Sequence, residues 1–221
     1  MDIVESIKNL HRKVSRLCLM ISVYLLLEHI LDDIEFGLGA TLNQLKKENI
    51  MCIVFSDTVN LNGEDILAEL HNSLVKIYNV NSLTLMRNIL NMNFMNQEKE
   101  IKQKLYDVKQ DFKPDIIFSA SRKSHNPDHK VLGESVLSVF QEQTVLFYEV
   151  IRGDYEFQPN LYNEVSEEDA EVKQDAIRQY ITQTKKRDYA KSSIILSQLL
   201  FRGSQILRKY AESFEVGRIV V

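Results

Sequence analysis

Two patterns of apolar positions alternate along this chain. Almost entirely apolar runs of strand length occur at residues 17–27, 50–56, 115–121 and 144–151. Short apolar runs bounded by polar residues are typical of strands buried on both faces of a sheet. Longer segments with apolar positions three or four residues apart, which predict amphipathic helices, occur at residues 36–49, 64–79, 96–112 and 128–142.

Strands that alternate with helices, and that are apolar on both faces, predict a parallel sheet covered on two sides. We therefore expect an α/β fold, in the form of a single Rossmann-like three-layer domain with a mostly parallel sheet. A chain of 221 residues is long enough for one sizeable core and short for two independent domains. We place this domain at residues 17–221, after an N-terminal helix at residues 1–16.

The N-terminal helix is favoured over a secretory signal. The basic stretch HRKVSR before the apolar run has the charge order of a signal peptide. The apolar run is nevertheless too short to span a membrane, and no small residues for cleavage follow it. Helical spacing of apolar residues is found instead at Ile3, Ile7, Leu10 and Val14.

The C-terminal segment FRGSQILRKYAESFEVGRI predicts an amphipathic helix closed by a short strand. Its core-facing positions are expected to be Leu200, Leu207, Tyr210 and Phe214. Two charged residues lie among these apolar positions, Arg202 and Glu212, and a charge near a buried interface normally needs a partner. We expect Arg202 to make a charge-assisted contact that supports a loop near the functional face.

Charge and cysteine content narrow the class of protein. The chain carries 27 basic and 31 acidic residues, for a formal charge of −4, and the basic residues are not clustered. We therefore expect no nucleic-acid partner. Both cysteines, Cys18 and Cys52, lie in apolar runs, where a reduced thiol packs as a small hydrophobe. This usage indicates a reducing, cytoplasmic location, and no transmembrane segment is expected.

Candidate metal ligands follow two of the predicted strands. Ligands collect where the parallel strands of such a sheet end. The relevant side chains are Asp32 and Asp33 after the first run, and Ser119, Ser121, His125, Asp128 and His129 at and after the third. Histidine nitrogen and aspartate oxygen together form a typical zinc ligand set. The alternative for the two aspartates is a solvated helix start, where negative charge is favoured by the helix dipole.

Other chemistries have weaker support. The stretch GLGAT has the glycine spacing of a dinucleotide loop, but Leu42 stands at the third glycine position and the preceding acids would repel a pyrophosphate. No G-x-S-x-G elbow is present, and neither cysteine has a candidate base in an arrangement typical of covalent catalysis.

Several stretches, in order, resemble the PIG-L/LmbE-like family of zinc-dependent N-acetylglucosaminyl de-N-acetylases. They are DDIEFGLGATLNQL, KPDIIFSAS, NPDHKVLGES, YE at residues 148–149, and LLFRGSQILRKYAESFEVGRI, and they span about residues 17–219. The resemblance implies hydrolysis of an N-acetyl group on a glucosamine-type sugar carried by a lipid, an oligosaccharide or another conjugate. It also implies a Zn2+ cofactor, although another divalent metal is possible. The expected partner is a small-molecule or glycoconjugate substrate, with a homo-oligomer possible.

The resemblance also assigns roles to residues. It makes Asp32 the general base and Asp33 and His129 metal ligands, with His29 as the remaining histidine ligand. Asp128 is counted with Asp32 among the catalytic residues and is expected to hold or tune the site beside His129, and His125 and Arg202 are expected to support it. Such a ligand set leaves a position open for water, whose proton a nearby carboxylate can take.

Two departures from the family pattern decide between two functions. In the family one residue separates the histidine from the aspartate pair, whereas Ile30 and Leu31 both intervene here. In the second loop, Asn126 stands where many relatives have a histidine, and His125 lies one position earlier. A bulge would return His29 to the metal. Without one, the chain would be a catalytically impaired relative that binds a sugar conjugate or a protein partner. The segment 152–163 is expected to shape the pocket in either case.

Overall fold

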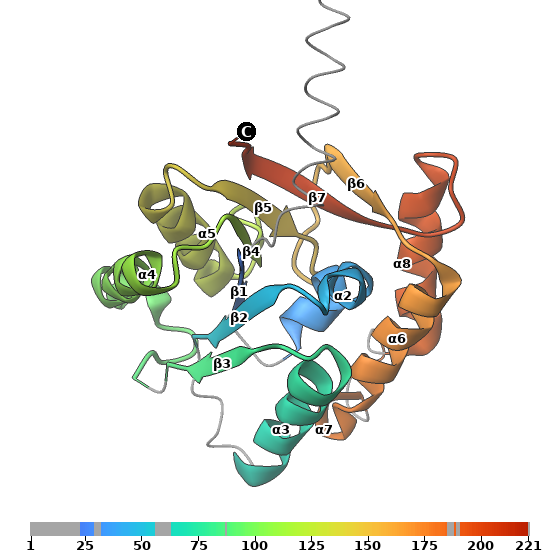
Figure 1. Ribbon diagram of the computed structural model, residues 1–221, viewed down its shortest axis with the longest axis horizontal. Helices are drawn as coiled ribbons and strands as arrows, with labels where there is room; N and C mark the ends of the chain where they lie inside the picture. Colours follow the sequence, from blue (N-terminus) through green and yellow to red (C-terminus); the bar gives the residue numbers. More distant parts are fainter. Residues whose placement is uncertain are drawn as a thin grey trace, which may run out of the picture.

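The computed structural model describes residues 23–28, 32–55, 63–86, 88–184, 188 and 191–220. Its centre is a seven-stranded sheet with the strand order β3-β2-β1-β4-β5-β7-β6 (Figure 1). The strands are β1 (Val23–Glu28), β2 (Asn49–Val54), β3 (Ser82–Leu85), β4 (Ile116–Ala120), β5 (Thr144–Tyr148), β6 (Leu161–Glu164) and β7 (Ala211–Arg218). The expected N-terminal helix at residues 1–16 lies outside the described residues, as do Cys18 and His29.

The sheet is parallel from β3 through β5 and antiparallel at its β7 and β6 edge. Strand β1 lies between β2 and β4, and its residues Leu25, Leu26 and Leu27 are fully buried. A central strand covered on both faces needs apolar side chains at successive positions, which explains the unbroken apolar run. The predicted α/β domain with a mostly parallel sheet is confirmed.

Helices cover both faces of this sheet (Figure 1). They are α2 (Asp33–Leu45), α3 (Gly63–Leu70), the π-helix η2 (His71–Ile77), the 3-10 helix η3 (Phe94–Asn96), α4 (Glu98–Phe112), α5 (Pro127–Val139), α6 (Glu167–Arg178), α7 (Ile181–Thr184) and α8 (Ser192–Ser204). Buried residues of α2, η2 and α6 share one core cluster, and those of α4 and α5 form a second cluster on the opposite face. Among the described residues, every helix is too short or too polar to cross a bilayer.

The prediction for the C-terminal segment was wrong in part. Helix α8 ends at Ser204, and residues 211–218 form β7 between β5 and β6. Tyr210 and Phe214 are buried as expected, but Leu207 is 88% exposed and Leu200 is also exposed. The chain turns at Leu207, whose φ of 60° is left-handed. It turns so tightly that a Cβ on Gly203 would lie 2.7 Å from the Lys209 carbonyl oxygen, so a helix cannot continue through this point.

Candidate functional site

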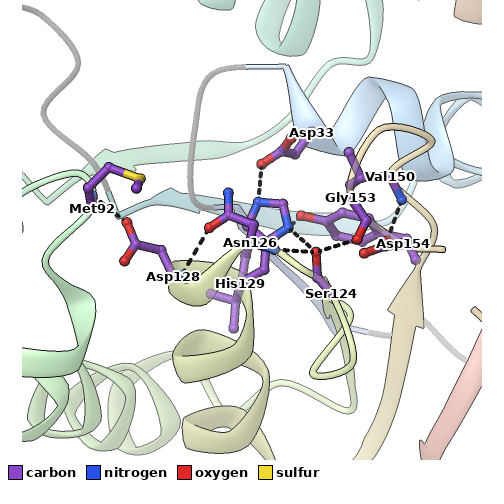
Figure 2. A network of polar contacts seen from close by, with 11 residues as sticks. Asp33, Met92, Ser124, Asn126, Asp128, His129, Val150, Gly153 and Asp154 are labelled. Atoms are coloured by element: carbon purple, nitrogen blue, oxygen red, sulfur yellow. Dashed lines mark hydrogen bonds and ion pairs between the residues drawn. The ribbon is translucent and has the colours of Figure 1, made fainter. Parts of the chain in front are cut away.

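The candidate site lies where β1 and β4 end, because these parallel strands are neighbours in the sheet. Asp33 is the first residue of α2, which follows β1, and His129 is in the first turn of α5, which follows β4. Figure 2 shows the two side chains pointing toward each other, with 3.1 Å between Asp33 Oδ2 and His129 Nε2. The two loops expected to converge on one cation therefore meet.

Both side chains of this pair are buried, with exposed fractions of 5% for Asp33 and 3% for His129. Burial by itself lowers the pKa of His129. The charge of Asp33 and its hydrogen bond, with the charges of Asp154 and Asp128, outweigh burial, so this pKa lies above its ordinary value. The carboxylates around His129 therefore favour a positive charge at this position, which a metal cation would also supply.

Asp32 is buried beside this pair, with only 3% of its surface exposed. It occupies the N-cap position of α2, yet its side chain makes no capping hydrogen bond there. The two aspartates do stand at the start of a helix, as the alternative interpretation expected, but that interpretation was wrong about solvation, because both carboxylates are withdrawn from water. This position is compatible with the expected role of Asp32 as a base.

Helix α2 begins at Asp33 and is kinked further along, at Leu38, where φ and ψ leave the helical region. The kink releases the carbonyl of Phe36, which accepts a 2.7 Å hydrogen bond from Lys173 Nζ. Lys173 also donates to Glu212 Oε1 at 2.6 Å. The two oxygens of Glu212 accept the backbone N–H groups of Ala40 and Thr41 at 3.0 and 2.6 Å. Glu212 therefore has the partner that its charge required, and the buried pair caps the second half of α2.

The two glycines of GLGAT are packing positions of α2. A Cβ on Gly37 would lie 2.3 Å from Cδ2 of Tyr148, and one on Gly39 would lie 2.7 Å from the Tyr78 hydroxyl. The Tyr148 hydroxyl in turn donates to the Leu27 carbonyl at 2.9 Å, next to the end of β1. These contacts bring α2 against the sheet. The two glycines therefore serve helix packing, which argues against a dinucleotide-binding loop here.

We expect Gly37→Ala to lower the free energy of unfolding by about 1 to 3 kcal/mol, because the added methyl group overpacks the buried Tyr148 ring. Urea unfolding of the variant and the parent measures the difference. Ala40→Gly, in the same helix, controls for a general change of helix propensity. An unchanged unfolding midpoint in Gly37→Ala would show that the ring moves away at no cost.

Asp128 holds a neighbouring loop in place. Its carboxylate accepts hydrogen bonds from the backbone N–H groups of Met92 and Phe94 at 2.5 and 3.1 Å. Its own N–H donates to Asn126 Oδ1 at 2.9 Å, where Asn126 caps α5. Figure 2 shows Asp128 turned toward Met92, on the side of α5 away from Asp154. This geometry fits the holding role expected of Asp128.

His125 and Arg202 lie outside the Asp33 and His129 pair. The His125 side chain is exposed, and its ring packs on Tyr155 with 5.0 Å between centroids. Arg202 forms two hydrogen bonds to Glu149, from Nε at 2.9 Å and Nη2 at 2.6 Å. The expected charge-assisted contact of Arg202 is thus present, and it links α8 to the residue after β5.

Two polar residues behind His129 were not among the expected site residues. Ser124 Oγ lies 3.4 Å from His129 Nδ1, and Asp154 Oδ2 accepts the Val150 N–H at 2.7 Å (Figure 2). Burial raises the pKa of Asp154 to about 6, against the lowering effects of the Val150 N–H, the Ser124 hydroxyl and the His129 charge. The only sequence signal for Asp154 was its place in segment 152–163, expected to shape the pocket.

The described donors fit part of a zinc site. Among the residues that the structure describes, no group of three or more His, Cys, Asp or Glu side chains is arranged to hold a metal ion. Asp33 and His129 supply one oxygen and one nitrogen of the type that zinc prefers. The expected third ligand, His29, and the intervening Ile30 and Leu31 lie outside the described residues. The described donors are therefore compatible with the metal.

An α/β sheet with a buried aspartate and histidine at its carboxyl edge is compatible with a metal-dependent hydrolase. The family model described as PIG-L, GlcNAc-PI de-N-acetylase, matches residues 29–140, which is about half of the chain. The chain therefore belongs to the PIG-L family of deacetylases. No curated protein matches it significantly.

Solved structures share the fold at low identity. The N,N'-diacetylchitobiose deacetylase from Pyrococcus horikoshii is 16% identical with a TM-score of 0.74, covering 98% of this chain and 93% of its own. The A40926 pseudoaglycone deacetylase Dbv21 is 15% identical with a TM-score of 0.73, covering 91% and 100%. GalB, a 4-carboxy-2-hydroxymuconate hydratase from Pseudomonas putida KT2440, is 15% identical with a TM-score of 0.71, covering 91% and 98%. At these identities the likeness establishes the fold.

Proposed function

We propose that this chain is a zinc-dependent hydrolase that removes the N-acetyl group from an N-acetylglucosamine-type sugar conjugate. The observation that carries the proposal is the buried approach of Asp33 to His129 from two separate loops at one edge of the sheet. Family membership supports the reaction type. Zn2+ is the metal expected from the nitrogen and oxygen donors, and a cytoplasmic location and a homo-oligomer stay predictions.

The residues have distinct roles in this proposal. Asp33, His129 and His29 would hold the metal. A zinc ion bound there would polarise the acetyl carbonyl and make a water molecule easier to deprotonate. Asp32 would take the proton from that water as it attacks the amide carbon. The same proton would then pass to the nitrogen as the C–N bond breaks, which gives acetate and the free amine of the sugar.

A second function is favoured by the departures in both loops. Asn126 uses its side-chain oxygen to cap α5, so the position where many relatives have a histidine serves the helix here. The first loop has an extra residue between His29 and Asp32. These features favour a catalytically impaired relative that binds a sugar conjugate or a protein partner without hydrolysing it.

Metal analysis coupled to an acetate-release assay separates the two functions. The full chain is stripped with a chelator, reloaded with Zn2+, Co2+ or Mn2+, and incubated with N-acetylglucosaminyl conjugates. The hydrolase predicts stoichiometric metal and acetate release that depends on it. Stoichiometric metal without acetate release would support the impaired relative for the conjugates tried. A chain that binds none of the three metals contradicts the metal-dependent hydrolase.

The raised pKa of Asp154 gives a prediction for the metal-free protein. Well below pH 4 its carboxyl is neutral in both the folded and the unfolded chain, so the group does not change the stability. Between about pH 4 and pH 6 the carboxyl ionises in the unfolded chain but not yet in the folded one, so stability falls by roughly 2 to 3 kcal/mol and levels off above pH 6. Asp154→Asn does not titrate and keeps an oxygen to accept the Val150 N–H. We therefore expect the variant to gain stability over the parent between pH 4 and pH 7.

Urea unfolding at several pH values measures this gain, with a chelator present throughout. Glu156→Gln serves as the matched control, because Glu156 is an exposed carboxylate in the same segment. A difference between Asp154→Asn and the parent that is flat from pH 4 to pH 7 would contradict the raised pKa.

A further inference from the structure

The His129 ring is in contact with polar groups at both nitrogens. Nε2 faces Asp33, and Nδ1 lies 3.4 Å from Ser124 Oγ (Figure 2). If Nε2 is the atom that meets the metal, Nδ1 carries the ring proton and must donate it to an acceptor. Ser124 is fully buried, so its hydroxyl oxygen rather than bulk water is available for that hydrogen bond.

The Ser124 hydroxyl can accept the His129 hydrogen bond and at the same time donate its own proton to another group. Its oxygen also accepts the Asn126 N–H at 3.3 Å, so its own O–H group is left to donate. One acceptor is the Gly153 carbonyl, at a long 3.4 Å. The other is the Asp154 carboxylate, whose charged form Ser124 stabilises. A charged acceptor makes the stronger hydrogen bond of the two.

The ionised Asp154 carboxylate lowers the stability of the fold at this buried position. It is buried, with one oxygen held by the Val150 N–H and the other, Oδ1, without a hydrogen-bond partner among the described residues. A buried polar atom without a partner is rare and requires an explanation. The positive charge that lowers the pKa of Asp154 is that of His129, on the far side of Ser124. A metal ion at Nε2 would place further positive charge in the same direction.

We propose that Asp154 is a positioning residue of the metal site and acts on His129 through Ser124. In this arrangement the Ser124 O–H turns from the Gly153 carbonyl, which lies 3.4 Å away, to the Asp154 carboxylate, and His129 Nδ1–H donates to Ser124. This fixes the ring orientation, places the proton on Nδ1, and leaves a more basic Nε2 for the metal. The inference rests on the proposed function for the identity of His129 as a ligand. No covalent bond forms or breaks in this arrangement.

Zinc affinity of the full chain tests the relay without any substrate. A chromophoric chelator competes for Zn2+ with the parent, Asp154→Asn, Ser124→Ala and the double variant, and Glu156→Gln is the charge control. Outer partners of a metal-bound histidine typically change metal affinity 10- to 100-fold. We expect each single variant to bind zinc about 10- to 100-fold more weakly than the parent. The control should bind as the parent does.

The double variant separates a relay from two independent effects. If Asp154 acts through Ser124, removing both should cost no more than the larger single loss, whereas independent contributions would multiply. Metal-free Asp154→Asn is expected to be at least as stable as the parent near neutral pH, so a weaker affinity cannot be explained by loss of the fold. Circular dichroism and urea unfolding of each metal-free variant check this point.

Three results would overturn the relay. Parental affinity in Asp154→Asn would show that Gly153 is the acceptor and that the carboxylate has no part. Losses that multiply in the double variant would show that the two residues act separately. A parent chain that binds no zinc would remove the proposed function together with the relay, whereas the first two results remove the relay alone.

Discussion

Asp32→Asn is expected to reduce the metal-dependent release of acetate by about 100- to 10,000-fold, the usual contribution of a general base. The amide that replaces the carboxylate keeps its size but cannot take a proton from the attacking water. Asp32 is buried next to the Asp33 and His129 pair and does not cap α2 with its side chain. The substitution should therefore leave the fold and the zinc content nearly unchanged.

Acetate release by the zinc-loaded variant and parent measures this loss, with metal content determined on the same samples. Asp107→Asn, on the exposed face of α4, controls for the change of charge. Retention of parental activity by Asp32→Asn would remove Asp32 from the role of base. Loss of zinc along with activity would instead make it a ligand.

His129→Ala and Asp33→Ala are each expected to weaken zinc binding by more than about 100-fold, since loss of a direct ligand should exceed the effect of an outer partner. The two remaining protein ligands would hold zinc only weakly. The structure places Asp33 Oδ2 and His129 Nε2 3.1 Å apart, so both losses should occur at the same site.

Competition with a chromophoric chelator measures both affinities. His71→Ala and Asp111→Ala are matched controls, because both residues are exposed and lie on other helices. The unfolding midpoint of each metal-free variant shows whether the fold has survived. If both variants hold zinc as the parent does, the assigned ligand set is wrong.

The sequence predicts the central part of the fold well because strands that are buried on both faces of the sheet need apolar residues at successive positions. Strands β1, β2, β4 and β5 carry nearly unbroken apolar runs, and the helices between them show regular apolar spacing. The loops that follow β1 and β4 could therefore be placed at one edge, and Asp33 and His129 do meet there. The family resemblance was also confirmed.

The closing strand at the C-terminus was predicted too short, and the first half of β7 was missed because its buried residues are partly charged. Glu212 is paired with Lys173, and Glu215 with Lys123 at 2.9 Å, so charges sit inside the fold with partners that are distant in sequence. A pattern of polar and apolar positions cannot show such pairing, and YAESF was read as a helix. The short β3 and β6, and α6 with its Lys173, were not assigned for a related reason, since their apolar content is low.

Parts of the site depend on contacts that no local pattern contains. Asp154 faces His129 only because the loop after β5 folds back beside the loop after β4, with Gly153 O accepting the His125 N–H at 2.7 Å. The role of Asn126 as the cap of α5 follows from its backbone geometry. The position of His29 depends on whether the loop before Asp32 bulges, which the described residues leave as a prediction.

The most direct test of a metal site between the two loops is a crystal structure of the full chain with added zinc. The account predicts anomalous density at one ion, with Asp33 Oδ2, His129 Nε2 and a His29 nitrogen each at roughly 2.0 to 2.2 Å. Deletion of Leu31 should then give no gain in affinity. A His29 ring that points into the core, with Ile30 facing the cavity and no ion between Asp33 and His129, would contradict the hydrolase and favour the impaired relative.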